Sequence, residues 1–592
     1  MTKPVITAAR KWAAGVAFFF FAQALMVSAQ DFTADSWWMP QDGNTDWFLL
    51  GNWSEGVPTA QKSMGFYDKY GTEEVLLEIS GISTASNGED AYSSYAYIYN
   101  YYDSSKFAVS VVSGATWQIS YDAYLGGENS SGRLSVESGS NVIIGNTLNV
   151  GGLDGNTGGN LSISGSGSVL NVGSSATLYS SNSSITVDDG GALKVTNGVL
   201  NAGLGLVSVS GLNSSLEAKG LRLNEFSFAD QANIASGQTY VLGAGTITDG
   251  ATWTLTDSLL VGSTGGNVAE LTISGGAQVV GASEYAAAIG QNNTQGRVIV
   301  TGAGSSWTQT GSLQIGYDAL SQGTLQIENG GSVQVTGDIM LATQAGSQGS
   351  MSVAQGASLY AQAVAVGKGV SDLTIQGTLT TTVIRREAPT GDTQGARRIT
   401  FDGATWNLLK LDTYNSTDGQ SILGGDGKVS SESAGFLSGE VTLGAGGLTV
   451  NTKTTAGEGL KATISADLSG TGGITKDGQG TLWLTGNNTF TGNVRVKEGG
   501  LGLVAGALDS SVTLYIEGNG FLDLESGILS VSSVVVNGVE LGQGEYTSAM
   551  DWITGTGTLQ VIPEPSMMMA LVLAFPISVI LRNRIRKRRF SA

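Results

Sequence analysis

The chain has 592 residues, of which 88 are glycine and only 7 are proline, and its formal net charge is −20. Apolar residues make up 41% of the chain, which argues against general disorder, and charged residues make up only 13%. Cysteine and histidine are both absent, which excludes disulfides, thiolate metal sites and a Ser-His-Asp arrangement. The acidic balance disfavours nucleic acid as a partner. We therefore expect no enzyme and assign no catalytic residue.

The N-terminal residues have the layout of a secretory signal peptide. Three basic residues precede an apolar run at residues 12–26, and small residues follow it. A basic start, a short apolar stretch and a small-residue end together form the signal for export and cleavage. We predict a signal peptide at residues 1–29, with cleavage between Ala29 and Gln30.

Residues 30–110 are rich in aromatic side chains. Trp37, Trp38 and Trp53 lie in this segment, together with a tyrosine-dense patch at residues 92–102. Large rings can cover the open first coil of a β-stack, so we predict an N-terminal aromatic cap. The alternative is carbohydrate binding, with glycan contacts at Trp37, Trp38 and Trp53, because sugar faces stack on aromatic rings.

Residues 111–382 repeat at a nearly constant period. Three alternating segments recur 26 residues later: Leu313–Ile315 as Ile339–Leu341, Leu325–Ile327 as Met351–Val353, and Val333–Val335 as Leu359–Ala361. Alternation is typical of half-buried strands, and the Gly, Asn, Asp and Ser residues between them favour turns. The period predicts an all-β fold, a parallel β-solenoid (β-helix) of about ten coils of 22–28 residues. These units resemble the passenger repeats of autotransporter-like proteins.

Residues 383–465 are predicted to continue the solenoid with a polar insertion. Arg385, Arg386, Arg397 and Arg398 flank a Pro- and Gly-containing stretch. We predict a solvated polar loop that protrudes from the stack at residues 383–400. The alternative is a local basic site for an anionic partner.

Residues 466–501 carry a more specific pattern. The segment reads Gly473-Ile474-Thr-Lys476-Asp-Gly478-Gln-Gly480-Thr-Leu482-Trp-Leu484, and then Gly486-Asn-Asn-Thr489-Phe490-Thr-Gly492. It resembles the autotransporter-associated β-strand repeat, with Phe490 where tyrosine is usual. The resemblance implies a structural role within a β-helical passenger and no catalytic residue.

Residues 502–560 are predicted to close the stack as a C-terminal β cap. The Asn537-Gly538 pair stands between two short apolar segments. Asn-Gly is a strong signal for a two-residue hairpin, so we expect antiparallel pairing there.

The tail at residues 561–592 has three parts in a fixed order. Pro563-Glu564-Pro565 precedes an apolar run at residues 567–581, and a basic cluster follows that ends in Arg588 and Arg589. We predict a short transmembrane helix, since the run is below the roughly 20 residues that a full crossing prefers. The order of parts resembles the PEP-CTERM sorting signal of Gram-negative bacteria. The resemblance implies recognition by an exosortase-type membrane protease, an inner-membrane intermediate, and final placement at the cell surface or in the extracellular matrix.

No cofactor and no metal site are predicted. Calcium is the alternative, either at Asp42-Gly-Asn44-Thr-Asp46 or at the Asp188-Asp189 corner, because both bring oxygen ligands together. An ordinary turn explains either segment equally well.

The patterns together favour a secreted structural or adhesive protein. Its expected partners are an exosortase-type protease and exopolysaccharide or neighbouring cells. The alternatives are a carbohydrate-binding module and a polysaccharide-degrading β-helix enzyme. Such an enzyme would need acidic or basic side chains clustered across neighbouring coils.

Overall fold

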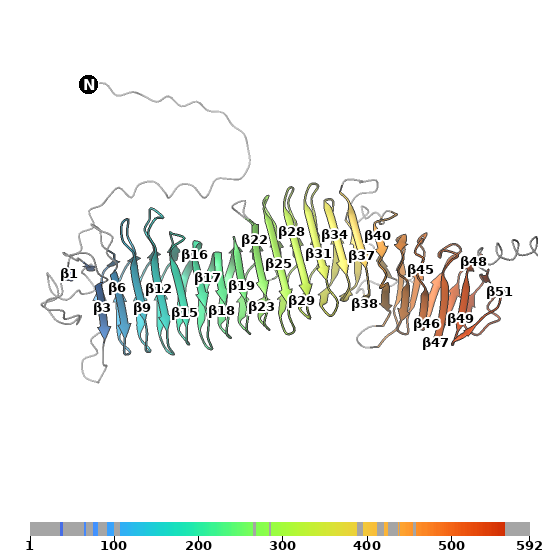
Figure 1. The fold of residues 1–592 in the computed structure, drawn as a ribbon, viewed down its shortest axis with the longest axis horizontal. Helices are drawn as coiled ribbons and strands as arrows, with labels where there is room; N and C mark the ends of the chain where they lie inside the picture. The colour runs from blue at the N-terminus through green and yellow to red at the C-terminus, as the bar shows by residue number, and fades with distance from the viewer. Residues whose placement is uncertain are drawn as a thin grey trace, which may run out of the picture.

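The protein is an elongated stack of β-strand coils (Figure 1). The structure is a computed structural model that describes residues 36–38, 64–66, 75–80, 91–99, 107–263, 268–282, 284, 286–387, 395–410, 420–423, 436, 438–453 and 457–562. Each coil passes through up to three walls, and each wall strand pairs in parallel with the equivalent strands of the coils before and after it. The predicted parallel β-solenoid is therefore confirmed.

Wall 1 begins each coil. Its separate strands are β4 (Ala91–Ser93), β7 (Thr116–Ile119), β10 (Asn141–Ile144), β13 (Val169–Val172), β20 (Thr252–Leu255), β23 (Gln278–Gly281), β26 (Ser306–Gln309), β29 (Ser332–Val335), β32 (Ser358–Ala361), β35 (Thr378–Thr381), β38 (Ala404–Leu408), β41 (Leu448–Asn451), β44 (Ile474–Asp477) and β49 (Ser533–Val536).

Wall 2 follows wall 1 along the chain. Its separate strands are β1 (Ser36–Trp38), β2 (Met64–Phe66), β5 (Ala96–Ile98), β8 (Ala123–Leu125), β11 (Leu148–Val150), β14 (Ala176–Leu178), β21 (Leu259–Val261), β24 (Ala287–Ile289), β27 (Leu313–Ile315), β30 (Ile339–Leu341), β33 (Ala363–Val366), β36 (Val383–Arg386), β39 (Gln420–Leu423), β42 (Lys461–Ile464), β45 (Thr481–Leu484) and β52 (Ile553–Gly555).

Wall 3 completes each coil. Its separate strands are β3 (Val75–Ser80), β6 (Phe107–Val112), β9 (Gly132–Val136), β12 (Gly159–Ser164), β15 (Ser184–Asp188), β19 (Ala244–Ile247), β22 (Val268–Ile273), β25 (Gln295–Thr301), β28 (Gln322–Glu328), β31 (Gln348–Val353), β34 (Val370–Ile375), β37 (Arg397–Phe401), β40 (Val441–Leu443) and β43 (Leu468–Gly470).

Five long strands turn corners without a break and serve more than one wall. They are β16 (Ala192–Val209), β17 (Ser215–Phe228), β18 (Asn233–Val241), β46 (Val494–Leu503) and β47 (Thr513–Leu524). Coils built from them are short, since Leu216 pairs with Ile234 on the next coil and Leu482 pairs with Leu501. Glycines such as Gly499 and Gly518 take positive φ at corners within these strands, but the strand continues through them.

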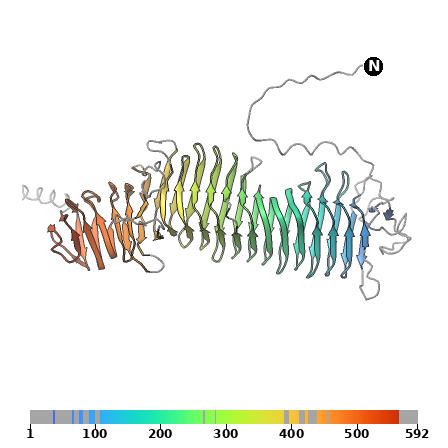
Figure 2. The same ribbon diagram turned by 180° about the vertical axis from the view of Figure 1, so that it is seen from behind.

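The stack contains more coils than the ten expected. Wall 1 alone runs through nineteen successive parallel strands: β4, β7, β10, β13, β16, β17, β18, β20, β23, β26, β29, β32, β35, β38, β41, β44, β46, β47 and β49. Figure 2 shows the stack of coils from behind. The wall begins before residue 111 and continues past residue 382, and this extension accounts for most of the difference.

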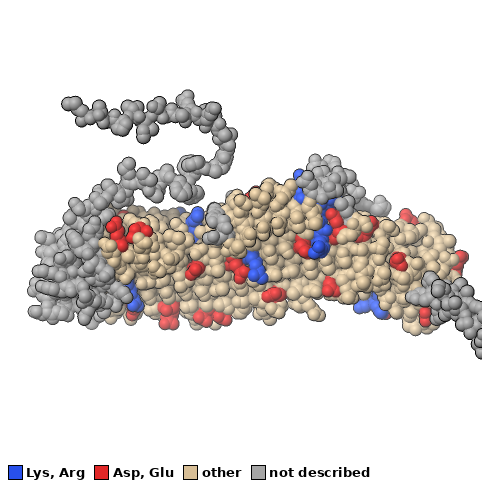
Figure 3. Space-filling model, turned by 45° about the horizontal axis from the view of Figure 1, so that its top comes forward, with Lys and Arg blue, Asp and Glu red and all other residues tan. Residues whose placement is uncertain are grey.

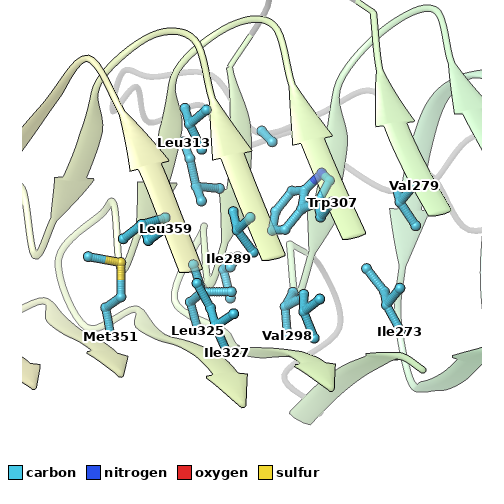
Figure 4. Packing of buried hydrophobic residues seen from close by; sticks show 14 of the residues in the cluster. Ile273, Val279, Ile289, Val298, Trp307, Leu313, Leu325, Ile327, Met351 and Leu359 are labelled. Atoms are coloured by element: carbon cyan, nitrogen blue, oxygen red, sulfur yellow. The ribbon is translucent and has the colours of Figure 1, made fainter. Parts of the chain in front are cut away.

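The interior is built from in-register apolar ladders. On wall 3, Leu271, Val298, Leu325, Met351 and Leu373 occupy one inward position on successive coils, and all are buried. Figure 4 shows several of these side chains pointing into the space between the walls. Because side chains alternate along a strand, every second residue enters the core and the residues between face outward.

Four tryptophans share a single inward position on wall 1. Trp117, Trp253, Trp307 and Trp406 all lie in this ladder and are almost fully buried, with Val or Leu on most of the coils between them. Figure 4 shows Trp307 among aliphatic neighbours. The Trp253 Nε1 donates to Ser236 Oγ at 2.9 Å, so the indole is satisfied inside the core. These tryptophans are core residues.

Serine hydroxyls link neighbouring coils at the corner that precedes wall 1. The backbone N–H groups of Gly114, Gly139, Gly190 and Gly276 donate to the Oγ atoms of Ser140, Ser168, Ser214 and Ser305, at 2.9 to 3.1 Å. Each of these serines lies on the following coil and is buried. The bonds satisfy turn N–H groups that the strand ladder does not reach.

The four arginines of residues 383–400 lie in strands and not in a protruding loop, so that part of the prediction was wrong. The polar stretch between them, residues 388–394, lies outside the described residues. Arg385 and Arg386 lie in strand β36, and Arg397 and Arg398 lie in strand β37. Strand alternation sends Arg386 inward, where it is 1% exposed. Arg397 is also buried, and its Nε donates to the carbonyl of Gly367 at 2.9 Å.

The C-terminal end contains the antiparallel pairing that the sequence predicted. Strand β49 pairs with β50 (Val539–Glu540) through an Asn537-Gly538 turn, and both turn residues have positive φ. Strand β51 (Gly544–Tyr546) pairs antiparallel with β53 (Thr558–Val561), which lies beside β48 (Ile528–Val531). Within the stretches that the structure describes, no helix is long and apolar enough to cross a membrane. Residues 567–581 lie outside those stretches.

One corner offers a test of backbone strain. Ala342 has φ +48°, whereas the preceding coil places Gly316 at the equivalent position with φ +67°. Left-handed backbone costs an L-residue about 1–2 kcal/mol. We expect Ala342→Gly to stabilise the local structure by about 0.5–1 kcal/mol once the entropy of glycine is subtracted. Amide hydrogen exchange of strands β27 and β30 measures this.

Gly316→Ala is the matched control. A Cβ at Gly316 would lie 1.9 Å from the carbonyl oxygen of Gln348, so this variant should accelerate exchange in the same strands. Equal amide exchange rates of strands β27 and β30 in Ala342→Gly and in the wild type would contradict the proposed backbone strain at Ala342.

Candidate functional site

Most of the residues predicted for sorting and glycan contact lie outside the described residues. This holds for Ala29, Gln30, Trp53, Pro563, Glu564, Pro565, Arg588 and Arg589. Trp37 and Trp38 are described only through the backbone of β1, which pairs in parallel with β2. Their roles stay predictions.

The first described coils carry a tyrosine stack on their outer face. Tyr97 and Tyr124 hold the same outward position on β5 and β8, and their ring centroids lie 5.3 Å apart with an interplanar angle of 11°. Tyr95 and Tyr121, at the preceding corner, stack at 5.1 Å and 17°. Tyr99 meets Tyr97 edge-on. The parallel coils dictate this arrangement, because they bring equivalent positions together.

Two members of the tyrosine stack were missed in the sequence, although a signal for them exists. The expected aromatic patch ended at residue 102, but Tyr121 follows Tyr95 by one coil and Tyr124 follows Tyr97 by one coil. Extending the coil period toward the N-terminus would have found both.

The stack is poorly shaped for sugar binding. One face of each stacked ring is covered by the tyrosine of the neighbouring coil. Carbohydrate platforms need open ring faces, since sugars stack through their own faces. The stack therefore serves cohesion between coils more directly than glycan contact.

Burial changes the acidity of the stack. It raises the pKa of Tyr124 to about 12, and the neighbouring Asp122 adds to the effect. Burial also raises the pKa of Tyr97, with Tyr124 and Tyr99 contributing. Both phenols therefore stay neutral well above the pH at which tyrosine ordinarily ionises.

Charged side chains on the outer walls are sparse, and some of them pair between coils. On the face in Figure 3, acidic and basic residues appear as small separate patches. Arg297 bonds Glu270 of the preceding coil at 2.9 Å, and Arg398 lies 3.5 Å from Asp372. Arg385 is held between Asp338 and Glu387. The last group brings two carboxylates together, and the guanidinium of Arg385 bonds both of them.

The Asp188-Asp189 corner gathers acidic groups without forming a cation cage. Burial raises the pKa of Asp188, and Asp189 and Glu137 raise it further. The Asp188 Oδ1 is buried and has no hydrogen-bond partner. In the described part of the chain, no group of three or more acidic, histidine or cysteine side chains could hold a metal ion.

The segment that resembles the autotransporter-associated repeat contains two buried polar side chains. Lys476 is fully buried, and its Nζ donates to the carbonyls of Gly478 and Glu498 at 2.6 and 2.7 Å. Asn488 accepts from the N–H of Leu468 and donates to the carbonyl of Ala507. Both residues satisfy corner groups that no strand pairs, which gives the lysine and the asparagine of this pattern a structural role.

The buried position of Lys476 lowers the pKa of its ammonium group. Burial lowers the pKa of Lys476 to about 8, although the charges of Asp477 and Glu498 oppose the shift. The shortest hydrogen bonds of the ammonium group go to the backbone carbonyls of Gly478 and Glu498.

Replacing this lysine should loosen the C-terminal coils. Lys476→Met would remove the lysine donor from the carbonyl of Glu498 and leave the carbonyl of Gly478 with only the 3.4 Å bond from Thr452 Oγ1, at a cost of about 1–3 kcal/mol. We expect the C-terminal coils to unfold at a lower urea concentration, and limited proteolysis at each urea concentration detects that unfolding. Lys497→Met, at an exposed position on the next coil, is the control and should leave the midpoint unchanged. Similar midpoints for both variants would refute the role of Lys476.

The tyrosine stack should make the N-terminal coils sensitive to alkali. Unfolded tyrosine ionises near pH 10, whereas folded Tyr124 ionises near 12. The folded state therefore binds more protons in this interval, and the free energy of unfolding should fall as pH rises from 10 to 12.

The double variant Tyr97→Phe/Tyr124→Phe removes both phenols and keeps both rings. Circular dichroism measures the urea midpoint of unfolding. We expect this midpoint to fall less between pH 9 and pH 11 in the double variant than in the wild type. Tyr240→Phe, in which the altered ring lies beside Arg222, is the control. Parallel falls in the wild type and the double variant would rule out the contribution of the stack.

Comparison with known proteins finds similarity to parts of two exported proteins. The adhesin BmaC autotransporter of Brucella suis biovar 1 (strain 1330) is 31% identical over 159 residues, which cover 25% of this chain and 5% of the adhesin. The extracellular serine protease of Serratia marcescens is 39% identical over 100 residues, which cover 17% of this chain and 9% of the protease. Neither a family model nor a solved structure matches. The chain spans less than a tenth of either relative, and the similarity supports autotransporter-like repeats.

Proposed function

We propose that this protein is a secreted structural and adhesive rod of the cell surface or extracellular matrix. The observation that carries the proposal is the long run of parallel coils, whose outward positions are largely uncharged. The partial similarity to an autotransporter adhesin supports the same role.

The mechanism of adhesion is geometric. Stacked coils repeat their outward positions at about 4.8 Å, so one wall presents a row of equivalent polar groups. On wall 3 a run of these groups is Ser162, Thr186, Ser208, Ser227, Thr246 and Thr272. Many weak contacts along one rod add to a high avidity. Exopolysaccharide or the surface of a neighbouring cell is the proposed partner.

Delivery is proposed to use both ends of the chain. The signal peptide at residues 1–29 would direct export, and the PEP-CTERM tail at residues 561–592 would hold an inner-membrane intermediate through residues 567–581. An exosortase-type protease would then recognise Pro563-Glu564-Pro565 and release the rod outward.

We propose a non-enzymatic role. The protease relative matches only 17% of this chain. On the described walls, several charged groups pair with partners of opposite sign on neighbouring coils, which uses them for cohesion.

Sorting can be tested in a Gram-negative host that makes the protein. In the wild-type host we expect the rod in the surface fraction, with a mature C-terminus that lacks Arg588 and Arg589 by mass spectrometry. Without the exosortase candidate, the uncleaved chain should stay in the inner-membrane fraction. Replacing Pro563-Glu564-Pro565 by three alanines should have the same effect.

A matched control replaces the exposed residues Glu545, Thr547 and Ser548 by alanine, which leaves the tail intact and should permit sorting. Recovery of surface protein that still carries Arg588 and Arg589 would contradict processing. Surface rods that fail to retain cells or exopolysaccharide would instead contradict adhesion and leave sorting standing.

A further inference from the structure

The tyrosine stack of the N-terminal coils has a geometry that favours covalent coupling. Tyr95 and Tyr121 come from adjacent coils, and their ring centroids lie 5.1 Å apart with an interplanar angle of 17°. The backbone holds them together, since the N–H of Tyr121 donates to the carbonyl of Ser94 at 2.8 Å. Neighbouring phenol rings at this separation are positioned to react with each other once oxidised.

We propose that Tyr95 and Tyr121 form an intramolecular dityrosine cross-link under one-electron oxidation. The oxidant class is hydrogen peroxide acting through a peroxidase. The cross-link would join two coils in a chain that contains no cysteine and therefore no disulfide. This inference goes beyond adhesion and does not depend on sorting.

The coupling is balanced in atoms and electrons. Each phenol loses one electron and one proton and becomes a phenoxyl radical. The two radicals join through a bond between ring carbons ortho to oxygen, and each ring returns its ortho hydrogen to the phenolic oxygen. Hydrogen peroxide takes up the two electrons and two protons and leaves as two water molecules.

Solvent exposure favours oxidation of the Tyr95–Tyr121 pair over the Tyr97–Tyr124 pair. Tyr121 is 52% exposed, so an oxidant in solution reaches its ring. Tyr97 and Tyr124 also stack, at 5.3 Å, but both lie deeper in the wall. The rings must slide from face-to-face to edge-on contact, a side-chain motion that exposed residues make within nanoseconds.

The ring of Tyr97 connects the two stacked pairs into one cluster. Tyr95 also stacks against Tyr97 at 6.1 Å, so a radical formed on one ring has a neighbour within the same cluster. The chain contains no cysteine thiol that would reduce it. Coupling should therefore concentrate at the end of the stack where the ring is most exposed.

A cross-link between Tyr95 and Tyr121 would stabilise coils near the N-terminal end of the described stack. These coils lie near the N-terminal end of the described stack, where β1, β2 and β3 precede them, and coils near an end open more readily than central coils. Joining adjacent coils restricts the opened state, in the way that other covalent cross-links do. The expected consequence is slower proteolysis of residues 91–136 after oxidation.

The test oxidises dilute purified protein with peroxidase and limiting hydrogen peroxide. We expect a monomer that has lost two hydrogen atoms and shows dityrosine fluorescence. Trypsin cleaves after Lys106 and Arg133, so Tyr95 and Tyr121 fall in separate peptides, residues 70–106 and 107–133. These two peptides should be recovered joined, with fragment ions that place the bond at Tyr95 and Tyr121.

Matched variants decide the assignment. Tyr121→Phe keeps the ring and the stack but should lose most of the cross-linked peptide, whereas Tyr240→Phe should keep the wild-type yield. Circular dichroism confirms that each variant is folded. Equal yields in Tyr121→Phe and the wild type, equal yields in urea-unfolded protein, or links between molecules only would each overturn the proposal.

Discussion

In-register parallel pairing is the constraint on which the rest of this structure depends. The backbone groups of each wall strand find their partners on the coils before and after, so no coil can shift alone. Every side-chain position is thereby repeated along a ladder at about 4.8 Å. Apolar residues gain from such repetition, whereas like charges would repel one another. The pairing of Glu270 with Arg297, and of Arg495 with Glu517, follows from this constraint.

Polar groups enter the interior where the ladder is interrupted. At corners the strand pairing lapses, and side chains take over the hydrogen bonds of the backbone. Ser140 does this for a turn N–H, Lys476 for two carbonyls, and Asn488 for groups of both kinds. Arg397 serves a carbonyl in the same way. The buried polar residues are thus part of the architecture of the corners, and they need no ligand to explain them.

The sequence predicted the fold where turns punctuate the strands and less well where they do not. Leu325–Ile327 and Met351–Val353 pair as their 26-residue spacing implied. The coils of β17 were missed because their corners lie within one long strand and the coils are short. Arg386 was assigned to a loop because the arginines flank a polar stretch that breaks the repeat, yet alternation within β36 turns its side chain inward. The tyrosine stack needed the coil period to be carried across residues 99–121, where aromatic composition alone suggested a cap.

The variation in coil length also affects how the rod responds to force. Where Leu216 meets Ile234 a coil uses few residues, and where Val298 meets Leu325 it uses many more, so the cross-section widens along the axis. Figure 1 shows this widening through the middle of the stack. The resistance of a rod to bending rises steeply with its thickness. Under a sideways pull, the narrow coils around β17 and β47 should therefore flex first, while the wide central coils stay straight.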